Sequence, residues 1–221
     1  MSEIEKISID FPLKGDWQFL RPPGHHPFAF DFVKMDEKRI KYSKRSKISF
    51  FMGKIPSDQY YCWDQPIYSP IDGIVLQTGV GWKDHQDTNI WKTLILWFNA
   101  TYRSKLEEID GKLEIRPNTG NYVMIKAEAG YIVFLAHLKC GSTIVEKGQA
   151  VKSGDLIGKV GNSGNSTAPH LHINLFDQMD DPYSAKVLPF VFNEYQKLDN
   201  DGEWKTQKLS IPKVKSFVRM D

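Results

Sequence analysis

The sequence has little of three things that would narrow its function early: cysteine, net charge and long apolar runs. Its only two cysteines, Cys62 and Cys140, cannot define a disulfide framework or a cysteine-type zinc site. We expect reduced, buried thiols, with a single disulfide as the alternative. A formal net charge of +2 gives no argument for a nucleic-acid partner. No run approaches the roughly 20 apolar residues of a membrane span, so we expect no membrane-spanning segment.

The N-terminal residues, MSEIEKISIDFPLKGDW, also lack the apolar core of a signal peptide. As written, the sequence therefore predicts a soluble, cytoplasmic chain. An extracytoplasmic location is expected only if the chain is a processed form. We expect a monomer.

What is present favours an all-β fold. The 221 residues are 41% hydrophobic and 13% aromatic, enough for a well-filled core. Short hydrophobic runs separated by glycine and proline turns are typical of antiparallel strands. We divide the chain into a lead-in (1–23), a core (24–176) and a C-terminal wrap (177–221), and we predict a strand within 46–55.

An insertion is expected at about 80–119, between two segments that look like adjacent sheet strands. Its apolar residues from Ile90 to Phe98 fall near helical spacing, which favours an amphipathic helix, with a strand pair as the alternative. Trp82, Trp91 and Trp97 could line a peptide groove or pack this helix. We interpret His85, in KDHQD, as a surface-loop residue.

The most informative stretch is GNSGNSTAPHLHINL, a glycine-rich loop that leads into a short strand. Strand alternation places His170 and His172 on one face and Leu171 and Ile173 on the other. Two such imidazoles could bind a metal, shuttle protons or carry a phosphoryl group. Alone, the pair could equally be solvent-facing histidines on an edge strand.

Other residues supply what a metal site would need. Asp31 alternates with Phe30 and Phe32 and follows His25 and His26 closely, and His137 ends a hydrophobic strand. A catalytic zinc takes three protein ligands and leaves one position open. The set is therefore sufficient for a mononuclear zinc hydrolase, although spacing alone does not show that its members meet.

Two segments resemble the lysostaphin-like murein metallopeptidases: GNYVMIKAEAGYIVFLAHL and VEKGQAVKSGDLIGKVGNSGNSTAPHLHINL. The resemblance covers about 24–176 without the insertion. It implies an antiparallel sheet or flattened barrel of the duplicated-hybrid-motif type, with a partly helical insertion. It also implies a zinc-dependent endopeptidase that cleaves stem peptides or cross-bridges of peptidoglycan, or another peptide substrate.

The resemblance also implies roles for individual residues. Asp31 and His172 would bind one zinc ion per chain, His170 would be the general base, and His137 would stabilise the oxyanion or assist proton transfer. Pro27 occupies the position where the family motif has its upstream histidine. We take His26 as the third ligand because its loop is shorter, and His25 as the alternate, which strand parity favours.

Two other functions are compatible with parts of the sequence. The first is a non-catalytic homologue that keeps the fold and has lost the metal. The second is a phosphohistidine carrier of the sugar-phosphotransferase IIA type, in which His137 and His170 would form the facing pair. The carrier has no use for Asp31 and its neighbouring histidines.

Overall fold

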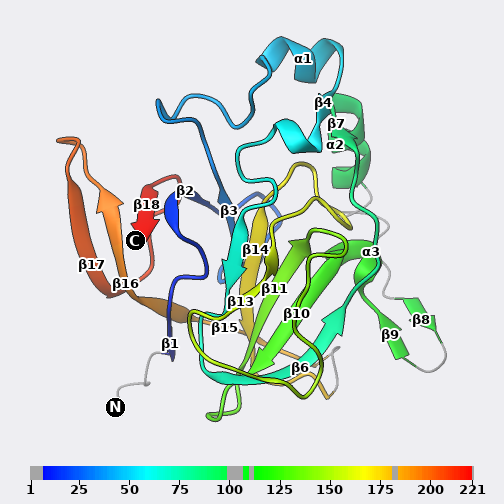
Figure 1. Ribbon diagram of the computed structural model, residues 1–221, viewed down its shortest axis with the longest axis vertical. Coiled ribbons are helices and arrows are strands. Elements are labelled where there is room, and N and C mark those ends of the chain that lie inside the picture. Colours follow the sequence, from blue (N-terminus) through cyan, green and yellow to red (C-terminus); the bar gives the residue numbers. More distant parts are fainter. Residues whose placement is uncertain (1–6, 99–106, 110–111, 181–183, 221) are drawn as a thin grey trace.

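The computed structural model describes residues 7–98, 107–109, 112–180 and 184–220. Its main feature is one large, open, mixed sheet (Figure 1), with strand order β1-β16-β18-β2-β3-β14-β11-β10-β6-β12, while β15 pairs with β14 and β17 with β16. The strands of this sheet are β1 (Ile7–Ile9), β2 (Gly15–Leu20), β3 (Phe30–Val33), β6 (Gly73–Gly79), β10 (Asn121–Lys126), β11 (Ile132–Leu138), β12 (Ala150–Val151), β14 (Leu171–Phe176), β15 (Val187–Leu188), β16 (Phe190–Leu198), β17 (Trp204–Ser210) and β18 (Phe217–Met220).

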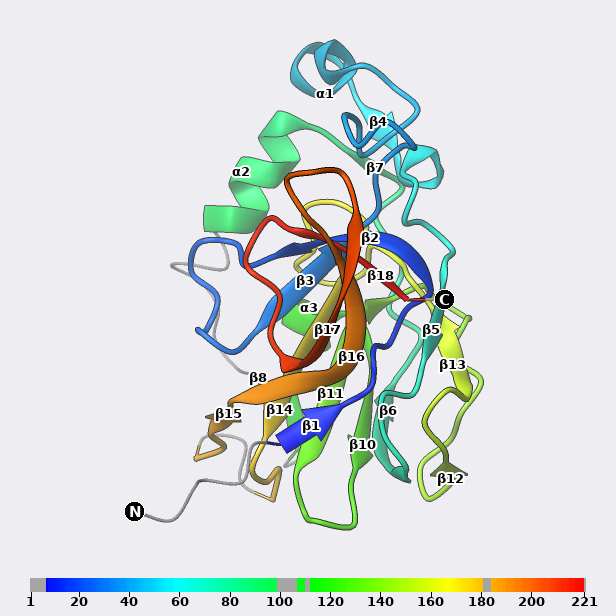
Figure 2. The same cartoon turned by 90° about the vertical axis from the view of Figure 1, so that its left-hand side faces the viewer.

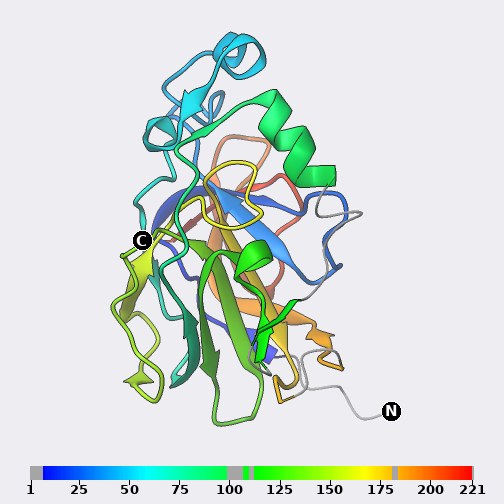
Figure 3. The same ribbon diagram turned by 90° about the vertical axis from the view of Figure 1, so that its right-hand side faces the viewer.

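Three two-stranded sheets and four short helices complete the described elements. The small sheets are β5 (Pro66–Tyr68) with β13 (Leu156–Lys159), β4 (Ile55–Pro56) with β7 (Asp87–Thr88), and β8 (Glu107–Ile109) with β9 (Lys112–Glu114). The helices are α1 (Lys47–Met52), η1 (Ser57–Gln59), α2 (Ile90–Phe98) and α3 (Arg116–Thr119). Figures 2 and 3 show α1 and α2 at one end of the molecule and the hairpin between β10 and β11 at the other.

The main core lies on one face of the sheet, because the strands alternate apolar side chains toward it. Phe30 and Phe32 of β3 and Leu171 and Ile173 of β14 are buried there, in the alternation that the sequence predicts. A smaller apolar cluster, which includes Phe134 and Ala136, covers part of the opposite face. That opposite face also carries Asp31 and His172.

The predicted all-β class with a partly helical insertion is confirmed, since the sheet dominates and α2 lies within 80–119. The predicted strand in 46–55 is wrong over most of its length. Ser46 caps the N-terminus of α1 by accepting a hydrogen bond from the Ser49 amide, and only Ile55 belongs to a strand. Residues 1–6 of the predicted lead-in, and 99–106 and 110–111 of the predicted insertion, lie outside the described residues.

The segments expected to lead into and wrap the core both add strands to the large sheet. Strands β1 and β2 come from the N-terminal segment, and β16 to β18 come from the C-terminal one. Pairing between β1 and β16 is parallel, which makes the sheet mixed. Both cysteines are free, and Cys62 is buried. Within the described residues, no helix is long and apolar enough to cross a membrane.

Candidate active site

Strands β3, β14 and β11 lie side by side and bring distant parts of the sequence to one place. Asp31 of β3 is directly opposite His172 of β14, and His172 is opposite Ala136 of β11. Because directly opposed residues of antiparallel strands point to the same face, Asp31 and His172 must meet. Their contact is a hydrogen bond of 2.8 Å between His172 Nδ1 and Asp31 Oδ1.

Asp31 is the centre of a histidine cluster. Its second carboxylate oxygen, Oδ2, lies 3.5 Å from His170 Nε2 and 3.6 Å from His25 Nε2. The carboxylate is 6% exposed and forms no ion pair with a lysine or arginine of the described chain. A buried carboxylate is costly unless a positive charge accompanies it. Among the described residues, the ionisable groups that pair with Asp31 are three histidines, so the cluster suits a bound cation.

The structure brings His25, rather than His26, to Asp31. One nitrogen of His25, one oxygen of Asp31 and one nitrogen of His172 all lie within 4.8 Å of one another. The His26 ring is exposed, and its Nδ1 accepts a hydrogen bond from the Phe28 amide instead. The geometry thus supports the alternate that strand parity favours, because the loop before Pro27 turns the two rings in different directions.

The donor set of two imidazoles and one carboxylate fits zinc, which binds these groups in catalytic sites. Burial would raise the pKa of Asp31, but the charges and hydrogen bonding of His170, His172 and His25 outweigh it and hold this pKa below its usual range. Burial lowers the pKa of His25, partly offset by the charge of Asp31. Both shifts keep the groups in the unprotonated forms that bind a metal.

His137 reaches the site through a β-bulge. Its neighbour Leu135 packs in the main core, so plain alternation would turn His137 into that core as well. Instead, Asn121 pairs with Leu138 and Tyr122 with Ala136, which leaves His137 without a partner on β10, at a φ of +63°. Bulges of this kind redirect side chains beside active sites.

The redirected ring of His137 faces those of His170 and His172. The ring centroids of His137 and His170 are 4.6 Å apart, and those of His137 and His172 are 6.0 Å apart. Burial lowers the pKa of His137 well below its usual value, and its histidine neighbours add to this shift. The ring is therefore neutral at pH 7.

Backbone carbonyls fix the tautomers of His137 and His170. His137 Nδ1 lies 2.8 Å from the Ser163 carbonyl, and His170 Nδ1 lies 2.7 Å from the Ala168 carbonyl. A carbonyl oxygen only accepts, so each Nδ1 carries the hydrogen and donates it. In the neutral form of either ring the lone pair is then on Nε2, and Nε2 of His170 faces Asp31.

The glycine-rich loop holds Ser163 in place through contacts with β10 and β11. The Ser163 hydroxyl donates to the Leu138 carbonyl and accepts from the Asn121 amide. Gly120 and Gly164 both have positive φ, and an added Cβ on Gly164 would lie 2.1 Å from the Gly120 nitrogen. Glycine is required at this crossing because the two backbones touch.

The segment before α2 braces the same loop, which the sequence did not indicate. Asp84 accepts hydrogen bonds from the Cys140 and Asn162 amides at 2.8 and 2.7 Å. His85 lies in a loop, as expected, but it is half-buried, and its Nε2 bonds to the Gly164 carbonyl. Asp84 and His85 stand among other charged and polar residues in KDHQD, and nothing in that segment marks the two as contacts of the loop.

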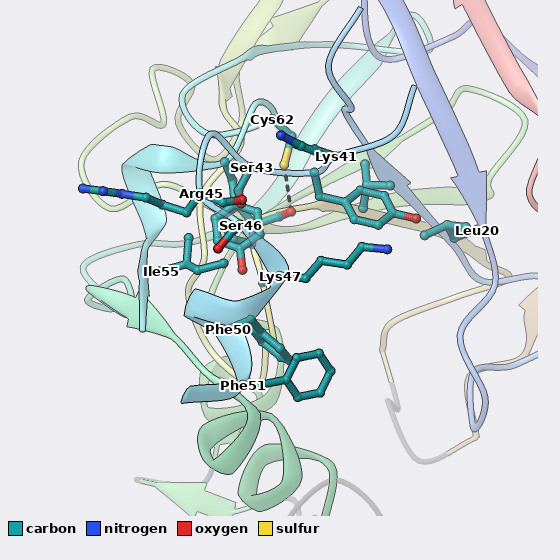
Figure 4. Close-up of a pocket in the computed structure, with 15 residues that line it drawn as sticks. Leu20, Lys41, Ser43, Arg45, Ser46, Lys47, Phe50, Phe51, Ile55 and Cys62 are labelled. Atoms are coloured by element: carbon teal, nitrogen blue, oxygen red, sulfur yellow. Dashed lines mark hydrogen bonds between the residues drawn. The ribbon is translucent and has the colours of Figure 1, made fainter. Parts of the chain in front are cut away.

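A cavity of about 530 Å³ lies next to the residues that precede His170 (Figure 4). Its wall includes Ala168, Pro169, Leu20 of β2 and Val33 of β3, which continues the face that carries Asp31. Cys62 donates a hydrogen bond to the Pro169 carbonyl, and burial raises the pKa of its thiol to about 12. This thiol is therefore structural rather than reactive.

Fold and site together define a β-sheet protein in which His25, Asp31 and His172 could hold a metal ion, with two further histidines beside them. Comparison with known proteins agrees: residues 107–183, which include His137, His170 and His172, match peptidase family M23. The peptidoglycan DD-endopeptidase ShyA of Vibrio cholerae is 44% identical over 59 residues, 27% of this chain and 13% of ShyA. ShyB of the same organism is 38% identical over 69 residues, 30% of this chain and 16% of ShyB.

Among solved structures, the catalytic domain of lysostaphin from Staphylococcus simulans is 16% identical, with a TM-score of 0.40. That likeness covers 82% of this chain and 88% of the domain. The segments that match the curated relatives span only 11% to 16% of those proteins. The predicted resemblance is confirmed over residues 107–183, where the chain is similar to peptidase family M23.

Proposed function

We propose that this protein is a zinc-dependent endopeptidase that hydrolyses peptide bonds in the stem peptides or cross-bridges of peptidoglycan. The observation that carries the proposal is the convergence of His25, Asp31 and His172 on one point, with His137 and His170 beside them. The names of the relatives ShyA and ShyB support peptidoglycan as the substrate.

We assign His25, Asp31 and His172 as the ligands of one zinc ion per chain. This assignment replaces His26, whose exposed ring is held by the Phe28 amide. A bound zinc ion would act as a Lewis acid that polarises the scissile carbonyl and acidifies water. The hydrogen bond between His172 and Asp31 shows that these two side chains are already oriented toward each other.

His170 is the general base in this proposal. Its Nδ1 hydrogen is held by the Ala168 carbonyl, which leaves the Nε2 lone pair directed to the Asp31 side of the site. A ring fixed in this way can take a proton from the attacking water without first changing tautomer.

His137 takes the second proton-transfer role. Because its Nδ1 hydrogen is bound to Ser163, the neutral ring has no hydrogen on Nε2 to donate to an oxyanion. It can donate there only after it has accepted a proton. We therefore favour proton transfer over direct oxyanion binding as its first function, and the protonated ring could then stabilise the negative charge.

The two alternative functions account for less of the site. A phosphohistidine carrier would use His137 and His170 but would leave Asp31, buried among three histidines, without a role. A non-catalytic homologue would have no need for the fixed tautomers of His137 and His170. Neither alternative is favoured.

Digestion of purified peptidoglycan, followed by mass spectrometry of the fragments, tests the proposal. We expect new peptide termini with the zinc-loaded protein and none after chelation, with activity restored by added zinc. His172→Asn should abolish both zinc binding and cleavage. Intact cross-links after incubation with zinc-loaded protein would contradict the proposal, and transfer of phosphate from a histidine-phosphorylated donor would favour the carrier.

A further inference from the structure

Helices α1 and α2 turn large apolar side chains toward solvent. In α2, the stripe Trp91, Leu94 and Ile95 has the i, i+3, i+4 spacing that normally faces a core. Here it faces outward, with Trp91 71% and Ile95 60% exposed. The packing role considered for Trp91 is therefore wrong. In α1, Met52 is 86% exposed, and Ile48 and Phe51 are exposed as well.

The two helices form one end of the molecule, as all three views show (Figures 1, 2 and 3). Strand β4, which follows α1, pairs with β7, which precedes α2. Asp87 of β7 adds ion pairs to Lys54 and Lys92, one from each side of this junction. We call Ile48, Phe51, Met52, Trp91, Leu94 and Ile95 the apical surface. All six side chains are exposed, whereas exposed apolar residues of an ordinary protein exterior are scattered singly.

The chain around α1 is strongly basic. Residues 38–54 contain no aspartate or glutamate, and their basic residues are Lys38, Arg39, Lys41, Lys44, Arg45, Lys47 and Lys54. Lys41, Lys44, Arg45 and Lys47 are exposed and form no ion pair with any described residue. A protein partner that covered both the apical surface and this basic segment would have to present an apolar face and acidic residues together.

We propose that the apical surface docks on an anionic phospholipid bilayer, with the apolar side chains in the interface and the basic segment over the headgroups. Tryptophan, phenylalanine, methionine and isoleucine beside lysine and arginine form the pattern of interfacial membrane binding. As far as the structure describes α1 and α2, neither helix is long enough to span a bilayer, so we infer a surface contact. Charge complementarity with anionic lipid selects this occupant over a neutral apolar partner.

Co-sedimentation of the full chain with lipid vesicles tests the proposal. We expect binding to vesicles of phosphatidylcholine mixed with phosphatidylglycerol and little binding to phosphatidylcholine alone. The double variant Lys44→Glu/Arg45→Glu should lower the partition coefficient at least about tenfold. Met52→Ser combined with Ile95→Ser should lower it by a similar factor. Trp91 emission should shift to shorter wavelength on binding, and Trp91→Phe should remove that shift.

Matched controls lie at the opposite end of the molecule. Lys147 and Lys152 flank the short strand β12, and Ile144 is also exposed. Lys147→Glu/Lys152→Glu reverses two positive charges there, and Ile144→Ser is the control for the single change Ile95→Ser. We expect both controls to bind like the wild type.

Failure of the wild type to bind anionic vesicles would overturn the proposal, as would equal losses in the apical and control variants. Self-association that depends on Trp91 and Ile95, without vesicle binding, would also overturn it and would assign the surface to a second copy. Each readout is independent of peptidase activity.

Discussion

Removal of the Asp84 carboxylate should disturb the candidate active site, because Asp84 holds the glycine-rich loop in place. Asp84 accepts from two backbone amides, Cys140 after β11 and Asn162 after β13, and lies in neither the metal cluster nor the histidine pair. A hydrogen bond to a charged group is worth about 1.5–3 kcal/mol. Because Asp84 is half-buried, we take about 1.5 kcal/mol for each of its two bonds and expect Asp84→Ala to lower the free energy of unfolding by about 3 kcal/mol.

The same change should also reduce turnover, at least about tenfold. Without Asp84 the loop can shift, and the Ser163 carbonyl would no longer hold His137 Nδ1. Urea unfolding and peptidoglycan digestion measure the two effects. Titration of His137 by nuclear magnetic resonance adds a readout of the ring itself, and its pKa should move toward the ordinary value as the site opens.

Asp36→Ala is the matched control for Asp84→Ala. Asp36 also accepts from two backbone amides, those of Ile40 and Lys41, but in a loop outside the site. We expect it to leave turnover unchanged. If Asp84→Ala matched the wild type in both unfolding and turnover, the bracing role of Asp84 would be refuted.

Three further outcomes are expected. His170→Asn should retain zinc, measured by metal analysis, and lose turnover about 10²-fold to 10⁴-fold; unchanged turnover would remove the base role. Burial lowers the pKa values of His25 and His137. Below about pH 6.5 the native metal-free protein therefore binds fewer protons than the unfolded chain. Its free energy of unfolding should consequently fall as the pH drops further. Urea midpoints at pH 5 and 7.5 test this, and equal midpoints would contradict it. Gly120→Ala should lower the free energy of unfolding by at least about 2 kcal/mol, because its Cβ would lie 2.3 Å from Ser163 at a φ of +61°. An unchanged melting temperature would contradict the close backbone contact between Gly120 and the glycine-rich loop.

The sequence was most informative where side-chain periodicity decides the outcome. Alternation in the strand after the glycine-rich loop placed His170 and His172 together and Leu171 and Ile173 in the core, as the structure has them. The meeting of His172 with Asp31 depends on the register between β14 and β3. No local pattern encodes a pairing between residues so far apart in the chain, and only the resemblance suggested it.

Features that break periodicity were not predictable in the same way. A bulge turns His137 onto the site, and nothing in the segment YIVFLAHL marks its position. The SKISFFMGKI segment has the β-branched and aromatic residues of a strand, but it forms α1 after the Ser46 cap. The apolar stripe of α2 predicted a helix correctly, although periodicity alone could not tell that the stripe faces outward.

Zinc content of two single variants tests the central assignment most directly. His25→Ala and His26→Ala remove neighbouring imidazoles, yet only His25 lies against Asp31. After dialysis against a competing chelator, we expect His26→Ala to retain one zinc ion per chain. His25→Ala should bind zinc at least about 100-fold more weakly. Retention of zinc by His25→Ala and its loss from His26→Ala would contradict the assigned ligand set.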